Sequence, residues 1–527
     1  MSGWSVSSKP SEKQYDAIIV GGGHNGLVAA NYLSRAGLKV LILEKNEDVG
    51  GATVSQRVFP EYDAKLSRYS YLVALLPDQI INDLGLTFTT LRRPVSSFTP
   101  VKRDGKDLGL LIDHDPTTRT ERAFREIAGE KEFAAWQSFY SDVRQIAEVI
   151  APTMLEKLPT RTELSAKVNH PIWEAILEEP LSKVLESTFT NDLVRGIVLT
   201  DGLVGTFARA DEMLANICFL YHLIGNGTGE WRVPRGGMGG LVAELKNLAI
   251  KNGVEILTDS PVHTLTREST IWEVSTPSGT FHAPYVLANC APQVLSMLLS
   301  EDQPESREGS QTKINMLLAR LPRLKSGDDP TSAFAGTFHF DEGYKEFAMA
   351  FAEASAGQIP TKIPAEMYCH TLTDSSILSP ELVAKGFHTL TLFAFHTPAS
   401  LFAGGQAKNK ETKSEILRRV LVQLNEYLLD PIEECLAKNS DGSLCIEVRS
   451  PIDLEEEISL PSGNIFHRDL TFPFREDDEP SGWGVETGHP GLYLCGAGAR
   501  RGGGVSGIPG HNAAVAVLEA HSSLSKY

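Results

Sequence analysis

The chain contains little cysteine and no closely spaced cysteine pair. Its six cysteines are scattered over 527 residues, without a C-x-x-C pair and without a Cys/His spacing suited to zinc. The spacing therefore suggests neither a disulfide framework nor a redox-active dithiol, and we expect no metal site. We interpret the cysteines as small buried hydrophobic residues in a reducing compartment.

Long apolar runs and an excess of basic charge are also missing. The longest apolar stretch, residues 213–224, is interrupted by Asn216 and His222 and is shorter than the ~20 residues that span a bilayer. Lys and Arg total 49 against 67 Asp and Glu, a formal net charge of −18, which argues against a nucleic-acid partner because phosphate binding requires a basic face. The first fourteen residues show no signal or transit peptide, so the cytoplasm is the expected location.

The sequence does contain a β-α-β pattern near its N-terminus. Residues 17–20 and 40–43 are continuous apolar runs, and the segment 27–36 between them is helical in composition. Runs without polar alternation indicate strands that are covered on both faces, as in a parallel sheet between layers.

A G-x-G-x-x-G motif lies between the first run and the helix. Gly21 allows the tight turn, Gly23 lets the backbone approach a pyrophosphate, and Gly26 permits close helix–strand contact, while the helix N-terminus supplies partial positive charge. Glu44 follows the second run, where a carboxylate can accept hydrogen bonds from ribose hydroxyls. The pattern predicts dinucleotide binding, and the acidic residue argues against a 2′-phosphate.

Three further glycine-rich segments narrow the identity of the dinucleotide. Glu44 is followed after five residues by Gly50-Gly51, residues 231–241 combine Pro234 with Gly236-Gly237-Met238, and residues 496–514 are rich in glycine after a strand. Many glycines permit close backbone approach and leave amide N–H groups free to meet the electron-rich edge of a reduced flavin.

Together these segments resemble the phytoene-desaturase-related flavoproteins, and more narrowly the pyridine nucleotide-disulfide oxidoreductase domain-containing protein 2 group. The narrower resemblance depends on residues 21–30, 313–315, 464–467 and 494–498. Two departures stand out: Ala52-Thr53 replaces an arginine that usually follows the diglycine, and Ala499-Arg500-Arg501 replaces a usual threonine-histidine-proline.

The resemblance implies an α/β fold with a Rossmann-like FAD-binding domain of the glutathione-reductase-like, amine oxidase/phytoene desaturase type. We expect a flexible polar tail at 1–14, the FAD-binding domain at 15–90, 228–300 and 450–527, a largely helical cap at 91–227, and an α+β substrate domain at 301–449. Within these regions, the periodicity predicts helices over 115–158 and 411–438 and a strand over 389–395.

The residues expected to contact FAD come from all of these motifs. They are Gly21, Gly23, His24, Asn25, Gly26, Glu44, Lys45, Gly50, Gly51, Val262, Gly496, Ala497, Gly504, Val505 and Ser506. His467, Arg500 and Arg501 are the candidate catalytic residues, although a histidine bonded to a neighbouring carbonyl and salt-bridged loop arginines are the simpler structural interpretations. Tyr221, His222 and Trp231 are candidates for lining a substrate cavity, or are core residues.

The implied function is an FAD-dependent oxidoreductase that dehydrogenates or isomerises an apolar, polyene-like or lipid-like small molecule by hydride transfer to flavin N5. The electron acceptor would be oxygen, a quinone or a partner protein, because no second G-x-G-x-x-G follows a strand. An FAD-dependent amine oxidase and a non-catalytic flavoprotein that acts through a protein partner are the alternatives. The oligomeric state, a peripheral membrane contact and a mitochondrial location, which the resemblance also allows, stay open.

Overall fold

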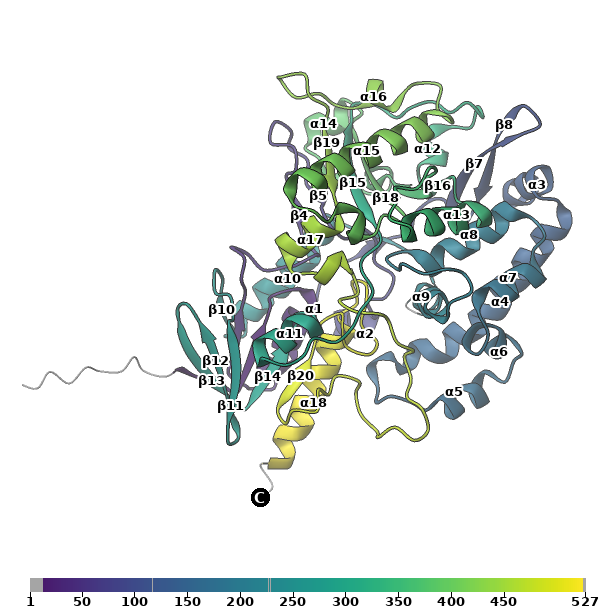
Figure 1. The fold of residues 1–527 in the computed structure, drawn as a ribbon. Helices are drawn as coiled ribbons and strands as arrows, with labels where there is room; N and C mark the ends of the chain where they lie inside the picture. The colour runs from purple at the N-terminus through teal and green to yellow at the C-terminus, as the bar shows by residue number, and fades with distance from the viewer. Residues whose placement is uncertain (1–12, 116, 226, 228, 525–527) are drawn as a thin grey trace, which may run out of the picture.

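The computed structural model describes residues 13–115, 117–225, 227 and 229–524. Figure 1 shows three parts: a parallel sheet with its helices, a seven-stranded sheet above it, and a group of helices beside both. Most of the tail expected at 1–14 lies outside the described residues. Its last two residues form a short strand, β1 (Lys13–Gln14), which pairs with β13 (Gly279–Ala283).

The five-stranded parallel sheet is built from three distant parts of the sequence. Its order is β10 (Glu255–Leu257), β3 (Val40–Leu43), β2 (Ala17–Val20), β14 (Tyr285–Ala288) and β20 (Leu492–Leu494). Strands β2, β3 and β14 are buried at every position, as their continuous apolar runs predict. Helices α1 (His24–Arg35), α10 (Met238–Lys251) and α18 (Ile508–Leu524) pack together beside it. The predicted Rossmann-like α/β fold is confirmed.

The seven-stranded sheet has one apolar face and one polar face. Its order is β19 (Ile446–Arg449), β15 (Thr312–Leu318), β18 (His388–Ala394), β17 (Ala365–Tyr368), β16 (Thr337–Phe340), β7 (Ser97–Arg103) and β8 (Lys106–Ile112). On the apolar face, Phe338 and Met367 join a core with residues of α15 (Gln406–Asn425). Alternate positions therefore carry polar side chains to the opposite face.

Two boundaries differ from the sequence-based expectation. Strands β7 and β8 were placed in the helical cap, but β7 pairs with β16 through Ser97 and Thr337, so residues 97–112 belong to the seven-stranded sheet. The helix expected over 411–438 begins at Gln406 and ends at Asn425, and a separate short helix, α16 (Ile432–Cys435), follows Pro431.

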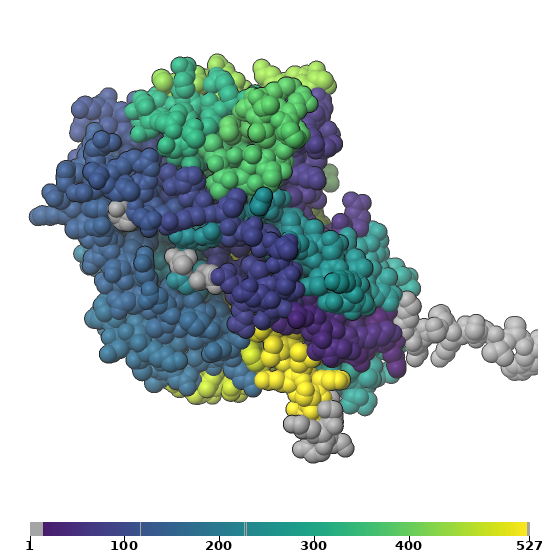
Figure 2. Space-filling model, turned by 180° about the vertical axis from the view of Figure 1, so that it is seen from behind, coloured from purple at the N-terminus to yellow at the C-terminus, as the bar shows by residue number. Residues whose placement is uncertain are grey.

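The helical part occupies residues 118–224 and shares its own hydrophobic core. It contains α3 (Thr118–Ile127), α4 (Glu130–Ile150), α5 (Arg161–Val168), α6 (Ile172–Leu177), α7 (Leu181–Thr188), α8 (Asp192–Leu203) and α9 (Met213–Ile224). In Figure 2 this blue region lies against both the green sheet region and the purple segments of the nucleotide-binding part. Among the described residues, no helix combines the length and apolar character required to cross a bilayer.

The contact between α18 and α1 depends on Gly510. A Cβ atom added at Gly510 would lie 2.1 Å from the backbone oxygen of Asn25. This close approach holds the C-terminal helix directly against the helix that begins at the glycine loop.

We expect Gly510→Ala to destabilise the protein by about 1–3 kcal/mol, because the added methyl group forces the two backbones apart. Thermal unfolding monitored by circular dichroism measures the effect. Ser523→Ala, at the exposed end of the same helix, serves as the control. Equal melting temperatures for the two variants would show that the helix contact tolerates separation.

Candidate active site

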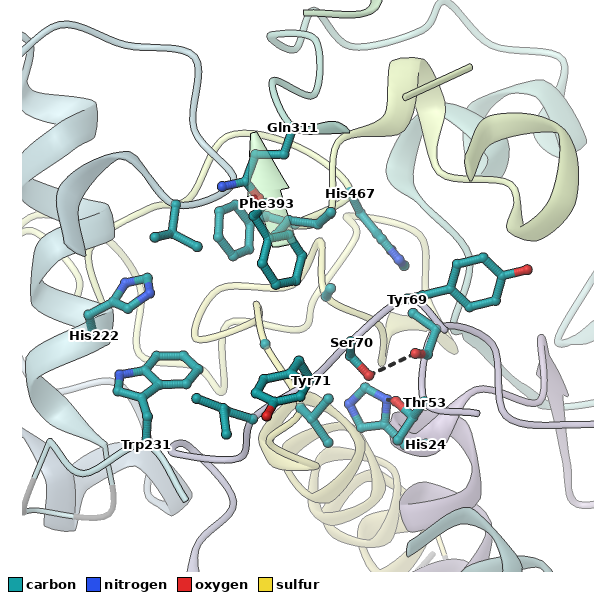
Figure 3. Close-up of a pocket in the computed structure, with 18 of the residues that line it drawn as sticks. His24, Thr53, Tyr69, Ser70, Tyr71, His222, Trp231, Gln311, Phe393 and His467 are labelled. Carbon is teal, nitrogen blue, oxygen red and sulfur yellow. Dashed lines mark hydrogen bonds between the residues drawn. The ribbon is translucent and has the colours of Figure 1, made fainter. Parts of the chain in front are cut away.

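A single large cavity of about 880 Å³ brings the three parts of the molecule together. Its wall includes Gly23 of the glycine loop, Tyr140 of α4 and Glu366 of β17. The size falls within the range of pockets that bind cofactors and small molecules. Figure 3 shows its central section, with His24 and Ser70 on one side and His222 and Trp231 on the other.

Glu44 organises the glycine-loop end of the cavity. Its carboxylate accepts hydrogen bonds from the backbone N–H groups of Gly22, at 2.7 Å, and Asn46, at 2.9 Å. The side chain is 6% exposed and lines the cavity beside Gly21 and Gly23. The acidic residue thus lies where the β-α-β pattern predicts it, next to the turn that would receive a diphosphate.

The glycines of the loop are required by close packing. A Cβ atom at Gly26 would lie 2.6 Å from the Gly21 backbone oxygen and 2.8 Å from Nδ2 of Asn289. Asn289, which follows β14, also donates from Nδ2 to the Gly21 oxygen at 2.9 Å and lines the cavity. The sequence analysis missed this asparagine, although a polar residue at the end of a parallel strand is a recognisable signal.

The diglycine lies against the glycine loop. The Gly50 N–H donates to the Gly22 oxygen at 2.9 Å, and Gly51 adopts a φ of 55°, which favours glycine. Gly51 lines the cavity, whereas Gly50 lies behind it.

Most of the residues predicted to contact the cofactor face this one cavity. Those that line it are Gly21, Gly23, His24, Asn25, Glu44, Lys45, Gly51, Val262, Ala497, Gly504 and Val505. Gly26, Gly50, Gly496 and Ser506 are not part of its wall.

His24 and His467 present unpartnered nitrogen atoms in the wall of the cavity. Nδ1 of His24 is hydrogen-bonded to Oγ1 of Thr53 at 2.9 Å, while His24 Nε2 and His467 Nδ1 have no partner among the described residues. Burial lowers the pKa of each imidazole to about 4. Both rings are therefore neutral at pH 7, and each offers a polar atom to a bound group.

Arg500 and Arg501 do not reach the cavity wall, contrary to their expected catalytic role. Arg500 pairs with Glu479 at 2.8 Å. Arg501 is 1% exposed and donates to the backbone oxygens of Pro473, Met154 and Glu156. Because their guanidinium groups are bonded to Glu479 and to these backbone carbonyls, both arginines act as anchors for the C-terminal loops.

The aromatic end of the cavity contains two of the three predicted substrate residues. His222 and Trp231 stack with ring centroids 4.7 Å apart, and both line the wall. Tyr221 instead donates its hydroxyl to the Thr471 oxygen at 3.0 Å and is not in the wall. Helices α4 and α8 add apolar side chains, namely Trp136, Tyr140, Val143, Ala147 and Ile197.

The polar face of the seven-stranded sheet forms a wall that the sequence analysis did not anticipate. Its cavity-lining residues are Lys313, Thr337, His339, Glu366, Tyr368 and Phe393. Tyr368 lies 4.7 Å from Tyr71, between ring centroids, and donates its hydroxyl to Glu366 at 2.6 Å. Burial, with the nearby Glu342 carboxyl, raises the pKa of Glu366 to about 8. Alternation of polar and apolar residues along β16 and β17 is the sequence signal that could have identified this wall.

Comparison with known proteins places the chain among flavoproteins. Residues 19–76 match the family model described as an NAD(P)-binding Rossmann-like domain. An uncharacterized protein of Mycobacterium tuberculosis is 42% identical and aligns with 98% of this chain and 99% of its own length. Pyridine nucleotide-disulfide oxidoreductase domain-containing protein 2 of Mus musculus is 29% identical over 96% of this chain and 93% of its own. The chain belongs to this phytoene-desaturase-related family.

A more distant relative and a solved structure agree with this family. One of the limonene dehydrogenase polypeptides of Castellaniella defragrans is 22% identical, with 96% of this chain and 95% of that protein aligned. Cyclohexylamine oxidase from Brevibacterium oxydans shares the fold, with a TM-score of 0.58, 13% identity, and coverage of 97% of this chain and 99% of that one. Family and fold support an oxidoreductase of the FAD-dependent type.

We expect Arg501→Met to lower the free energy of unfolding by about 3 kcal/mol, because buried carbonyl groups lose their donor. Cofactor bound per folded chain should stay unchanged. Thermal unfolding and cofactor quantification measure the two effects, with the exposed Arg418→Met as the control. A stable variant that lost the cofactor would instead assign Arg501 to the binding site.

The two neutral histidines predict a stability that falls with acidification. Their pKa values are lower in the folded chain than the ordinary value of about 6.5, so the unfolded chain binds more protons between pH 6.5 and 4. The melting temperature should therefore fall across this range. His467→Asn should make the fall shallower, since asparagine tolerates the φ of 66° at this position; an unchanged slope would contradict the prediction.

Proposed function

We propose that this protein is an FAD-dependent oxidoreductase that dehydrogenates or isomerises an apolar small molecule. The observation that supports the proposal is one continuous cavity, which joins the glycine loop and Glu44 to the aromatic helices. A dinucleotide cofactor and a separate substrate could both contact such a cavity.

The described residues fit FAD at the nucleotide end. Glu44 lies where ribose hydroxyls could bond to its carboxylate, and Lys45 and Val262 line the same region. The glycine loop leads into α1, whose N-terminus favours a diphosphate. A Cβ atom at Gly23 would approach Nδ2 of Asn289 to 3.0 Å, so the turn presents backbone without side chains.

The isoalloxazine ring fits the region of His24, His467, Ala497, Gly504 and Val505. These residues line the cavity between the glycine loop and the sheet wall. The unpartnered atoms His24 Nε2 and His467 Nδ1 are polar groups that the edge of the ring could satisfy. Bound flavin supplies the hydride acceptor, while the neutral imidazoles hold it without adding charge.

The apolar substrate fits between this region and the aromatic end. Trp136, Tyr140, His222 and Trp231 enclose that end, and large aromatic surfaces exclude water from a reacting C–H bond. The relationship to a limonene dehydrogenase polypeptide supports dehydrogenation of a hydrocarbon-like compound. The reduced cofactor would pass its electrons to oxygen, a quinone or a partner protein.

We expect Glu44→Gln to weaken FAD binding at least tenfold, because an amide replaces a charged acceptor for ribose hydroxyls. Titration of cofactor-depleted protein with FAD, followed by flavin fluorescence, measures the affinity. Glu47→Gln is the matched control, since Glu47 is exposed three residues away. FMN, which lacks the adenylate, should bind equally to wild type and Glu44→Gln; failure of the wild type to bind FAD would overturn the proposal.

An anaerobic reduction screen tests the substrate class. The FAD-loaded protein should lose its visible absorbance with the apolar fraction of a metabolite extract and not with a panel of primary amines. Bleaching by amines, with hydrogen peroxide released in air, would replace the proposal with an amine oxidase. Bound FAD that no extract fraction reduces would favour the non-catalytic alternative.

A further inference from the structure

Three side chains with metal-binding atoms meet at the sheet wall of the cavity. His339 of β16 and Glu366 of β17 are directly paired in the antiparallel register, and Glu342 follows β16 by two residues. One potential ligand atom from each lies within 4.8 Å of the others, and all three residues are buried. The sheet register therefore brings together an imidazole and two carboxylates that are distant in sequence.

Each carboxylate is held by a hydroxyl donor on one oxygen. Oε2 of Glu342 accepts from Oγ1 of Thr200 at 2.7 Å and is hydrogen-bonded to Nδ1 of His339 at 2.6 Å. Oε1 of Glu366 accepts from the Tyr368 hydroxyl at 2.6 Å. Such outer hydrogen bonds are the arrangement that orients metal ligands in proteins.

Oε1 of Glu342 is an independent sign that a bound group is missing from this cluster. The side chain is 0% exposed, and this oxygen has no hydrogen-bond partner among the described residues. An unpaired carboxylate oxygen in the protein interior is costly. A cation placed within the cluster would satisfy it.

The charges around the cluster also leave room for a cation. Asp201 lies nearby in the cavity wall and adds a third carboxyl group. Arg93 is the neighbouring guanidinium, and it donates to Thr337 Oγ1 at 2.8 Å and to the Trp231 oxygen at 3.1 Å. One guanidinium cannot balance three buried carboxylates, and His339 adds a second positive charge only if it takes up a proton.

We propose that His339, Glu342 and Glu366 form a binding site for a divalent transition-metal ion. One nitrogen and two carboxylate ligands suit Zn²⁺ or Mn²⁺. The metal would take the place of the proton between His339 and Glu342. His339 and Glu366 line the cavity and Glu342 does not, so the remaining coordination positions face the cavity, where they can bind water or an oxygen atom of a substrate.

Metal binding by the full-length protein tests the site directly. The protein is treated with EDTA, dialysed, and titrated with ZnCl₂ and MnCl₂ by calorimetry, and its metal content is measured by mass spectrometry. We expect one equivalent of metal per chain. Flavin content is recorded separately on the same samples, so a chain without flavin can still confirm the metal site.

Variants identify the ligands. Glu342→Gln and Glu366→Gln should each lower metal affinity at least tenfold, and Thr200→Val, which removes only an orienting hydroxyl, should lower it less. Glu381→Gln, an exposed acidic residue, should leave it unchanged. Melting temperatures show whether each variant folds, and anomalous diffraction from Mn²⁺- or Zn²⁺-soaked wild-type crystals locates the ion should the glutamine variants unfold. Absence of a stoichiometric metal in the wild type, or an ion located elsewhere, would overturn the proposal.

Discussion

The bond between the Gly22 N–H and the Glu44 carboxylate is the contact on which the cavity depends. It joins the turn after β2 to the end of β3, so the diphosphate-binding turn and the ribose-binding acid keep a fixed spacing. The diglycine packs onto this turn through Gly50, and α18 packs onto α1 through Gly510. Each of these contacts brings backbone atoms to distances that a larger side chain would prevent.

The sequence predicts the nucleotide-binding part well because its signals are local. Continuous apolar runs, glycines at fixed offsets and an acidic residue after β3 describe a unit whose partners lie within about thirty residues. Val262 could be placed only through the resemblance, yet it lines the same cavity as Glu44. The glycines near residue 500 were similarly recognisable, because few other residues permit close backbone approach.

The residues that could not be predicted are those whose position depends on strand pairing between distant segments. Glu366 becomes a neighbour of His339 only through the register of β16 and β17, and Tyr368 meets Tyr71 from another part of the chain. The two arginines show the converse error. Charge beside a glycine-rich turn suggested a role at the flavin, but Arg501 is directed at backbone carbonyls, which composition alone does not reveal.

The interleaving of the parallel sheet has a consequence for the synthesis of the protein. Strand β20 pairs with β14, and the glycines that line the cavity beyond it, among them Gly504, are followed only by α18 and three further residues. A ribosome must therefore release almost the whole polypeptide before the coenzyme cleft can close. Cofactor capture is consequently a late event in biogenesis, and nascent chains that stall before residue 492 lack one wall of the cleft.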